Sequence, residues 1–184
     1  MAADWKTLQS ETLLRDRWID LRADRCATPQ GVEIAPYYVL SYPDWINVVA
    51  ITPEDHLVLV RQYRHGAGKV CLELPSGGVE AGESPEMTAR RELAEETGYV
   101  SDRWQLLCSL SPNPASHTNR VHSFLALEAR PGTSPKLDMG EEGLSVELRT
   151  LTEVQSQLTY GALDQAMHVS ALLLGLMHIG RLRT

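Results

Sequence analysis

The chain has 184 residues, of which 43% are hydrophobic and 22% charged, proportions that are typical of a folded domain and atypical of a disordered chain. Seventeen lysines and arginines stand against 24 aspartates and glutamates, which gives a formal net charge of −7. Because a protein that coats nucleic acid needs clustered basic side chains to displace counterions, this balance argues against a nucleic-acid partner.

The first part of the chain is expected to form paired strands. Residues 17–27 and 32–40 are rich in apolar and β-branched side chains and flank a Thr-Pro-Gln-Gly turn. Residues 46–52 and 56–63 form a second pair around a Pro-Glu-Asp turn. Within the last of these, residues 57–60 are apolar on both faces, which predicts a place inside a sheet that is covered on both sides.

A helix is expected at residues 85–97. Ser84 is the expected N-cap, Pro85 occupies the first helical position, and Gly98 lies just past the end. Further strands are expected at 71–74, 104–110, 120–128 and 144–150, a turn at 75–78, and a long final helix at about 162–179. Strands and helices in this order predict an α/β protein with a sheet sandwiched between helices.

No segment for export or for a membrane is evident. Residues 1–6 carry charge where a signal peptide needs an apolar run, and the longest apolar stretch, residues 171–177, is too short to cross a bilayer. Cys26, Cys71 and Cys108 form neither a CxxC pair nor an even set for disulfides. We therefore expect a cytoplasmic protein with reduced thiols and no membrane contact.

Three glutamates share one face of the expected helix. Glu92, Glu95 and Glu96 stand at i, i+3 and i+4, so their side chains fall within an arc of roughly 100°. Like charges at this spacing destabilise a helix, and the helix dipole opposes carboxylates near its C-terminal end. Two interpretations are open here: a solvated, glutamate-rich face, or a site for Mg²⁺ or Mn²⁺, which prefer carboxylate oxygens.

The residues around this helix resemble the Nudix box, G-x5-E-x7-R-E-U-x-E-E-x-G-U, in which U is a bulky apolar residue. The match begins at Gly77, passes through Glu83 and ends in the run Arg-Glu-Leu-Ala-Glu-Glu-Thr-Gly-Tyr at 91–99. All seven fixed positions agree, and Tyr99 stands where an aliphatic residue is usual. The resemblance implies a Nudix hydrolase: an α/β/α sandwich with a mixed central sheet and, here, an N-terminal antiparallel strand extension.

The resemblance extends over roughly residues 17–180 and is strongest to the ADP-ribose and nucleoside-diphosphate-sugar pyrophosphatases. It rests first on two runs that lead into the box, Leu-Val-Arg-Gln-Tyr-Arg at 59–64 and Leu-Glu-Leu-Pro-Ser-Gly at 72–77. It rests also on Pro114, sixteen residues after Gly98, and on the acidic loop Glu-Glu-Gly-Leu at 141–144 before a late strand. In that subfamily the N-terminal strands pack across a two-fold homodimer. We therefore expect residues 1–45 to be a dimerisation extension and residues 46–184 to be the Nudix hydrolase domain.

The resemblance also implies roles for individual residues. Glu83 supports the loop before the helix, and Arg91 orients the box carboxylates. Glu142 is the expected base from the acidic loop, with Glu141 as the second choice and a box glutamate as the alternative. The expected catalytic residues are Glu142, Glu96, Glu95 and Arg91. The expected metal ligands are Glu92, Glu95, Glu96, Glu142 and the backbone carbonyl of Ser76. The expected substrate contacts are Arg61, Arg64, Glu73, Pro114 and Arg120.

The predicted reaction is the hydrolysis of a nucleoside diphosphate sugar to a nucleoside monophosphate and a sugar phosphate, with Mg²⁺, or Mn²⁺ in its place, activating a water. One departure concerns the substrate: the run after Pro114 has no glycine, and Asn119 stands where the subfamily has glutamate. Which nucleotide sugar is preferred therefore stays open. A dinucleoside polyphosphate or RNA-cap hydrolase, and a non-catalytic sensor of ADP-ribose-like ligands, are the alternatives.

Overall fold

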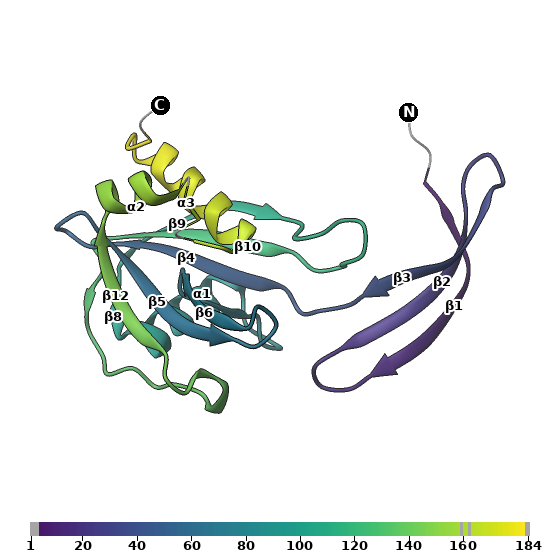
Figure 1. The fold of residues 1–184 in the computed structure, drawn as a ribbon, viewed down its shortest axis with the longest axis horizontal. Helices are drawn as coiled ribbons and strands as arrows, with labels where there is room; N and C mark the ends of the chain where they lie inside the picture. The colour runs from purple at the N-terminus through teal and green to yellow at the C-terminus, as the bar shows by residue number, and fades with distance from the viewer. Residues whose placement is uncertain (1–3, 159, 162, 183–184) are drawn as a thin grey trace. The chain divides into compact units, whose positions relative to one another are not determined.

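The computed structural model describes residues 4–158, 160–161 and 163–182, which belong to two compact units (Figure 1). The first unit comprises the described residues of Met1–Pro43 together with Ser111–Arg120. The second comprises Asp44–Leu110 and the described residues of Val121–Thr184. Each unit is described separately below.

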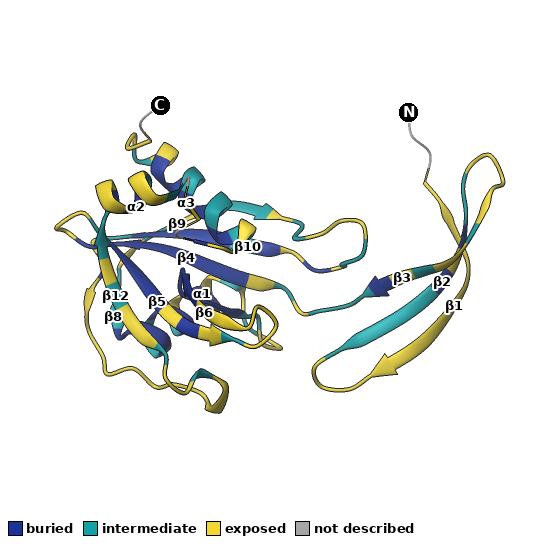
Figure 2. Cartoon of the chain, in the orientation of Figure 1, coloured by how far each residue is buried: buried dark blue, intermediate teal, exposed yellow. Residues whose placement is uncertain are grey.

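The first unit is a three-stranded antiparallel sheet. Its strands, in the order β1-β2-β3, are β1 (Lys6–Arg15), β2 (Asp20–Ala27) and β3 (Glu33–Leu40). Inside it, the buried carboxylate of Asp24 accepts hydrogen bonds from Ser10 Oγ at 2.6 Å and from Arg22 Nε at 3.1 Å. β2 and β3 were predicted, but β1 was not. Every residue of β1 is exposed, so its sequence carries no alternating apolar pattern (Figure 2).

The segment Ser111–Arg120 is held against β3 and the residues that follow it by hydrogen bonds to backbone carbonyls. The Leu40 N–H donates to the Ser116 carbonyl at 2.7 Å, and the Tyr37 hydroxyl donates to the Ala115 carbonyl. The Asn119 amide donates to the Pro43 carbonyl at 3.1 Å. These bonds explain why a segment so late in the chain belongs to the N-terminal unit.

The second unit is built on a seven-stranded mixed sheet. The strand order is β12-β5-β4-β10-β9, β6 pairs with β5, and β7 pairs with β4. The strands are β4 (Trp45–Ile51), β5 (His56–Arg64), β6 (Lys69–Glu73), β7 (Ser76–Gly78), β9 (Arg103–Leu110), β10 (Val121–Leu127) and β12 (Ser145–Thr150). β4 and β10 are parallel, and the other pairs are antiparallel. The short strands β8 (Tyr99–Val100) and β11 (Arg130–Pro131) form a separate two-stranded sheet.

β5 lies inside this sheet, as predicted from its apolar run. It is bonded to β4, β6 and β12, and Leu57, Val58 and Leu59 are fully buried (Figure 2). β7 departs from the expected turn at 75–78. Ser76–Gly78 pair with the beginning of β4, in the register Asn47↔Ser76, and so form a short strand.

Helices cover both faces of the sheet (Figure 1). On one face, α1 (Pro85–Thr97) packs Ala89 and Leu93 into a core cluster with β4 and β5. On the other, α2 (Leu151–Leu158) and α3 (Ala166–His178) contribute to a second, larger cluster. The predicted α/β/α sandwich is therefore confirmed.

The C-terminal helices differ from the single long helix that was expected. α2 is a separate short helix that directly follows β12, and α3 begins at Ala166. Ala162, the expected start of the final helix, lies outside the described residues. None of the helices in the described part of the chain is long and apolar enough to cross a membrane.

Candidate active site

The caps of α1 place the three glutamates of the box that lie on this helix. Ser84 Oγ accepts a hydrogen bond from the Met87 N–H at 3.2 Å, and Gly98 ends the helix with φ of 72°, a left-handed conformation that favours glycine. With this register Glu92 and Glu96 turn inward and are 9% and 2% exposed. Two of the three carboxylates are therefore buried, which excludes a fully solvated glutamate face.

One guanidinium connects the carboxylates of the box. Arg91 Nε donates to Glu83 Oε1 at 3.1 Å, and Arg91 Nη1 donates at 2.9 Å to both Glu92 Oε1 and Glu95 Oε2. The hydrogen bond to Glu83 is the largest of several contacts that raise the pKa of Arg91, and the same contact lowers the pKa of Glu83. Arg91 thus orients the carboxylates and partly neutralises them.

Strand β7, between β6 and α1, contributes backbone groups on the other side of Glu96. The Ser76 N–H donates to Glu96 Oε2 at 3.0 Å, in a buried contact across 20 residues of sequence. Next to it, Gly77 lies directly under the side chain of Glu92, and a Cβ built on this glycine would be 2.8 Å from Glu92 Cγ and closer still to the carboxylate. A side chain at position 77 would therefore displace Glu92.

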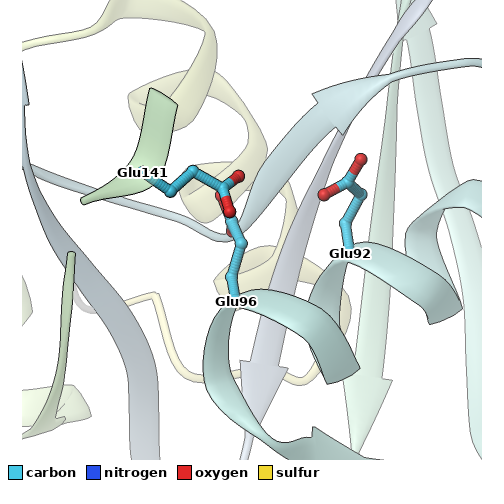
Figure 3. A group of neighbouring side chains, drawn as sticks. All are labelled: Glu92, Glu96 and Glu141. Carbon is cyan, nitrogen blue, oxygen red and sulfur yellow. The ribbon is translucent and has the colours of Figure 1, made fainter. Parts of the chain in front are cut away.

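A third carboxylate reaches this group from a distant segment. Glu141 belongs to the 3₁₀ turn η1 (Met139–Glu141) that precedes β12. One carboxylate oxygen from each of Glu92, Glu96 and Glu141 lies within 4.8 Å of the others. Figure 3 shows the side chain of Glu141 meeting that of Glu96, with Glu92 beside them on the same helix as Glu96. Glu141 was the second choice for the loop carboxylate. The first choice, Glu142, is exposed and is not part of this group of described residues.

The electrostatics of the group call for a cation. Burial raises the pKa of Glu96 to about 9 and that of Glu92 to about 7, and the carboxylate of Glu141 contributes to both increases. Buried carboxylates at this separation are stable only when they take up protons or a cation. Converging carboxylate oxygens are the ligands of a hard divalent ion, so the residues fit the predicted metal.

Comparison with known sequences gives the family. Residues 42–169 match the NUDIX domain, and residues 5–40 match the nucleoside diphosphate sugar hydrolase N-terminal domain. The chain belongs to the Nudix family. Both predictions from the sequence, the Nudix fold and the resemblance to the nucleoside-diphosphate-sugar subfamily, are confirmed.

Named relatives agree with this placement. The chain is 33% identical to the ADP-ribose pyrophosphatase of Bacillus subtilis over 67% of this chain and 66% of that protein. It is 35% identical to the methanol dehydrogenase activator of Bacillus methanolicus over 66% of this chain and 65% of that protein. Both matches span slightly less than two thirds of the relative's length. The ADP-ribose pyrophosphatase of Mycobacterium tuberculosis is 30% identical over 92% of this chain and 82% of that protein.

A solved structure matches the whole fold. The crystal structure of an ADP compounds hydrolase superposes with a TM-score of 0.86 at 26% identity and covers 99% of both chains. The likeness to this structure thus includes residues of both units.

The predicted substrate contacts of this Nudix chain occupy different places. Arg64 forms a two-pronged ion pair with Glu73, which is 3% exposed: Nε donates to Oε1 at 3.0 Å and Nη2 to Oε2 at 2.6 Å. Glu73 is the main cause of the raised pKa of Arg64, and Glu96 contributes. Arg64 therefore lies within the field of the Nudix box carboxylates, and Glu73 holds it there.

Arg61 lies elsewhere in the second unit. It pairs with Glu147 of β12 and lines a cavity of about 310 Å³ together with Gln157 of α2, on the face of the sheet away from α1. Side chains alternate along a strand, so Arg61 and Arg64 point to opposite faces of β5. The structure thus does not bring Arg61 to the Nudix box carboxylates. Pro114 and Arg120 belong to the first unit.

The sequence reasoning also missed a buried polar contact behind the site. His168 of α3 is 1% exposed, and its Nδ1 accepts a hydrogen bond from the Leu74 N–H at 3.3 Å. Burial lowers the pKa of His168 to about 4, so the imidazole is neutral at pH 7 and this acceptor is maintained. His168 therefore braces the strand end that leads to Ser76. A histidine on an apolar helix predicts packing, but its partner cannot be read from the sequence.

Proposed function

We propose that this protein is a metal-dependent Nudix pyrophosphohydrolase that cleaves a nucleoside diphosphate sugar such as ADP-ribose into a nucleoside monophosphate and a sugar phosphate. The observation that carries the proposal is the convergence of Glu92, Glu96 and Glu141, the first of which accepts a hydrogen bond from Arg91. The names of two relatives, ADP-ribose pyrophosphatases, and of the matching structure support the substrate class.

Different residues of the site would bind the cation and the substrate phosphates. Glu92, Glu96 and Glu141 would hold Mg²⁺, or Mn²⁺ in its place, with the Ser76 carbonyl and Glu95 as further predicted ligands. When bound, the cation neutralises the diphosphate and makes water more acidic. Arg64 binds a phosphate oxygen, for which its guanidinium geometry is suited.

The proton of the attacking water needs a carboxylate acceptor. Water adds to one phosphorus, the bond from that phosphorus to the bridging oxygen breaks, and the other phosphate leaves with the electron pair. We assign to Glu142 the role of accepting this proton, because Glu141 already lies with Glu92 and Glu96 at the proposed cation site. Arg120 and Pro114 stay predicted substrate contacts.

A substrate panel tests this function. With Mg²⁺, the protein is expected to release phosphatase-sensitive products from ADP-ribose or a related nucleotide sugar at least ten times faster than from a dinucleoside polyphosphate. Released phosphate after phosphatase coupling measures this, and added EDTA is expected to stop the reaction. Binding of ADP-ribose without hydrolysis would instead indicate a sensor.

We also propose a cytoplasmic homodimer formed through the N-terminal extension, residues 1–45. β1 exposes Leu8, Leu13 and Leu14, and Trp5 just before it is also exposed. Apolar side chains grouped on one strand are typical of an interface. The three cysteines are free, as a reducing compartment requires. Light scattering after size-exclusion chromatography is expected to give roughly twice the chain mass of 20.5 kDa, and a mass of one chain would contradict the dimer.

A further inference from the structure

The segment that carries Glu141 has few attachments to the body of the second unit. Before it, the Lys136 N–H donates to the Glu95 carbonyl at 2.8 Å, at the end of α1. After it, β12 begins at Ser145, which pairs with Arg61 of β5. Between these two points lie residues 137–144, all of which are exposed except Glu141 and Leu144, which are partly buried. Burial of apolar side chains therefore does little to fix the position of this segment.

The segment does have internal structure of its own. The Asp138 N–H donates to Glu141 Oε2 at 2.8 Å, and the Glu141 N–H donates back to the Asp138 carbonyl at 2.9 Å. The Leu144 N–H donates to the Glu141 carbonyl at 2.9 Å. These bonds give η1 its shape and hold the carboxylate of Glu141 in one orientation relative to its own turn. They do not determine where the turn lies relative to α1.

A buried side chain of β5 supplies that link. Gln62 is 5% exposed, and its Nε2 donates to the carbonyl of Gly140, the residue before Glu141, at 3.3 Å. Because side chains alternate along a strand, Gln62 lies on the same face of β5 as Arg64 and Val58, and Val58 packs with α1. Among the described residues, Gln62 is the side chain outside residues 137–144 that hydrogen-bonds to this segment.

The carbonyl oxygen of the Gln62 side chain indicates that this glutamine does not serve to stabilise the fold. Its Oε1 is buried and has no hydrogen-bond partner in the described part of the chain. A buried polar atom without a partner destabilises the fold, and an apolar side chain of similar size would avoid that penalty. The contact with Gly140 is what an apolar residue at this position would lose.

We infer that Gln62 is a positioning residue: by holding Gly140, it places Glu141 beside Glu92 and Glu96 and completes the cation site against the mutual repulsion of the three carboxylates. This inference rests on the proposed function of that site. It assigns to β5 a role in placing a ligand that comes from a loop 78 residues further along the chain.

The test replaces the amide by an apolar side chain of similar size. Gln62→Leu is expected to lower the Mn²⁺ affinity, measured by electron paramagnetic resonance, by about 10- to 100-fold, the usual effect of losing a group that orients a metal ligand. The kcat measured with Mg²⁺ is expected to fall by about the same factor. Amide hydrogen exchange at residues 137–144 is expected to become faster, while the thermal midpoint stays the same or rises. Gln155→Leu is the control, because the Gln155 amide donates a similar bond to the Arg181 carbonyl at 2.9 Å from a partly buried position on α2.

A double variant separates positioning from a general structural effect. If Gln62 acts through Glu141, Gln62→Leu has no further effect on Mn²⁺ affinity in a Glu141→Gln background. Multiplicative effects of the two substitutions, or a Gln62→Leu protein with wild-type Mn²⁺ affinity and wild-type exchange at 137–144, would overturn the inference. If Gln62→Leu does not fold, Gln62→Met is measured in the same way.

These readouts also separate this inference from the proposed function. A wild-type protein that cleaves no diphosphate would contradict the proposed function, while Mn²⁺ affinity and hydrogen exchange would still decide the role of Gln62.

Discussion

Replacing Glu96 by glutamine is expected to lower Mg²⁺-dependent hydrolysis by more than about 100-fold, since losing a ligand exceeds the effect of losing a group that only orients one. The amide keeps the size of the side chain and an oxygen that accepts from the Ser76 N–H, so the fold is retained. Only the charge that would hold the cation is removed. Coupled phosphate release under saturating Mg²⁺ measures the effect.

The same substitution is expected to stabilise the metal-free protein at alkaline pH. The pKa of Glu96 is about 9 in the folded protein against an ordinary value of 4.5. The unfolded chain therefore releases this proton above about pH 4.5 while the folded chain keeps it, and the folded state loses stability as pH rises toward 9. Glu96→Gln lacks this loss, so its free energy of unfolding at pH 8 should exceed that of wild type by about 1 to 3 kcal/mol, the scale for a buried group without a full set of partners.

Urea unfolding in EDTA at pH 5 and pH 8 checks this expectation. The two proteins are expected to differ at pH 8 and to differ much less at pH 5, because pH 5 lies close to the ordinary pKa of 4.5 and the unfolded wild type still keeps part of this proton. Mg²⁺ should then stabilise wild type and not the variant, because a ligand stabilises only the state that binds it. Glu86→Gln is the control: Glu86 is an exposed residue of the same helix, paired with Arg90. Unchanged turnover of Glu96→Gln would refute the metal site.

Gly77→Ala is expected to lose activity by about 100-fold while the protein stays folded. A Cβ at this position overlaps the end of the Glu92 side chain, which is flexible and can rotate away. The stability therefore changes little, but Glu92 leaves both Arg91 and the other carboxylates, and a displacement of about 1 Å in an active site can reduce the rate about 100-fold.

The neighbouring glycine provides a matched control. A Cβ at Gly78 would lie 3.4 Å from a ring atom of Trp45, an ordinary contact, so Gly78→Ala should keep its activity. Both variants are compared by kcat/KM and by thermal midpoint. If Gly77→Ala were as active as Gly78→Ala, Glu92 would not need its observed position for catalysis.

Short-range sequence patterns were enough to predict helix α1 and the carboxylates that it presents. The cap residues Ser84 and Gly98 bracketed α1 correctly because capping involves atoms only a few residues apart. The spacing of the box then placed Glu92 and Glu96 on one face, since helical periodicity is the same in every helix. The family and the sandwich architecture followed from these residues and from the apolar run in β5.

Other elements could not be predicted because their residues carry no local pattern. β1 is exposed throughout, and its pairing with β2 defines it as a strand. Arg61 and Arg64 look alike in the sequence. They differ because Glu147 pairs with the first on one face of the sheet and Glu73 with the second on the other.

The acidic loop shows the same limit at the site itself. Glu141 and Glu142 are adjacent glutamates, and the backbone path of η1 directs the first toward Glu92 and Glu96. That path depends in turn on Gln62, which donates to the Gly140 carbonyl and lies 78 positions before that glycine. Spacing along the chain therefore specifies which carboxylates one helix presents, whereas the carboxylate that completes the site depends on contacts between distant segments, which form only when the chain has folded.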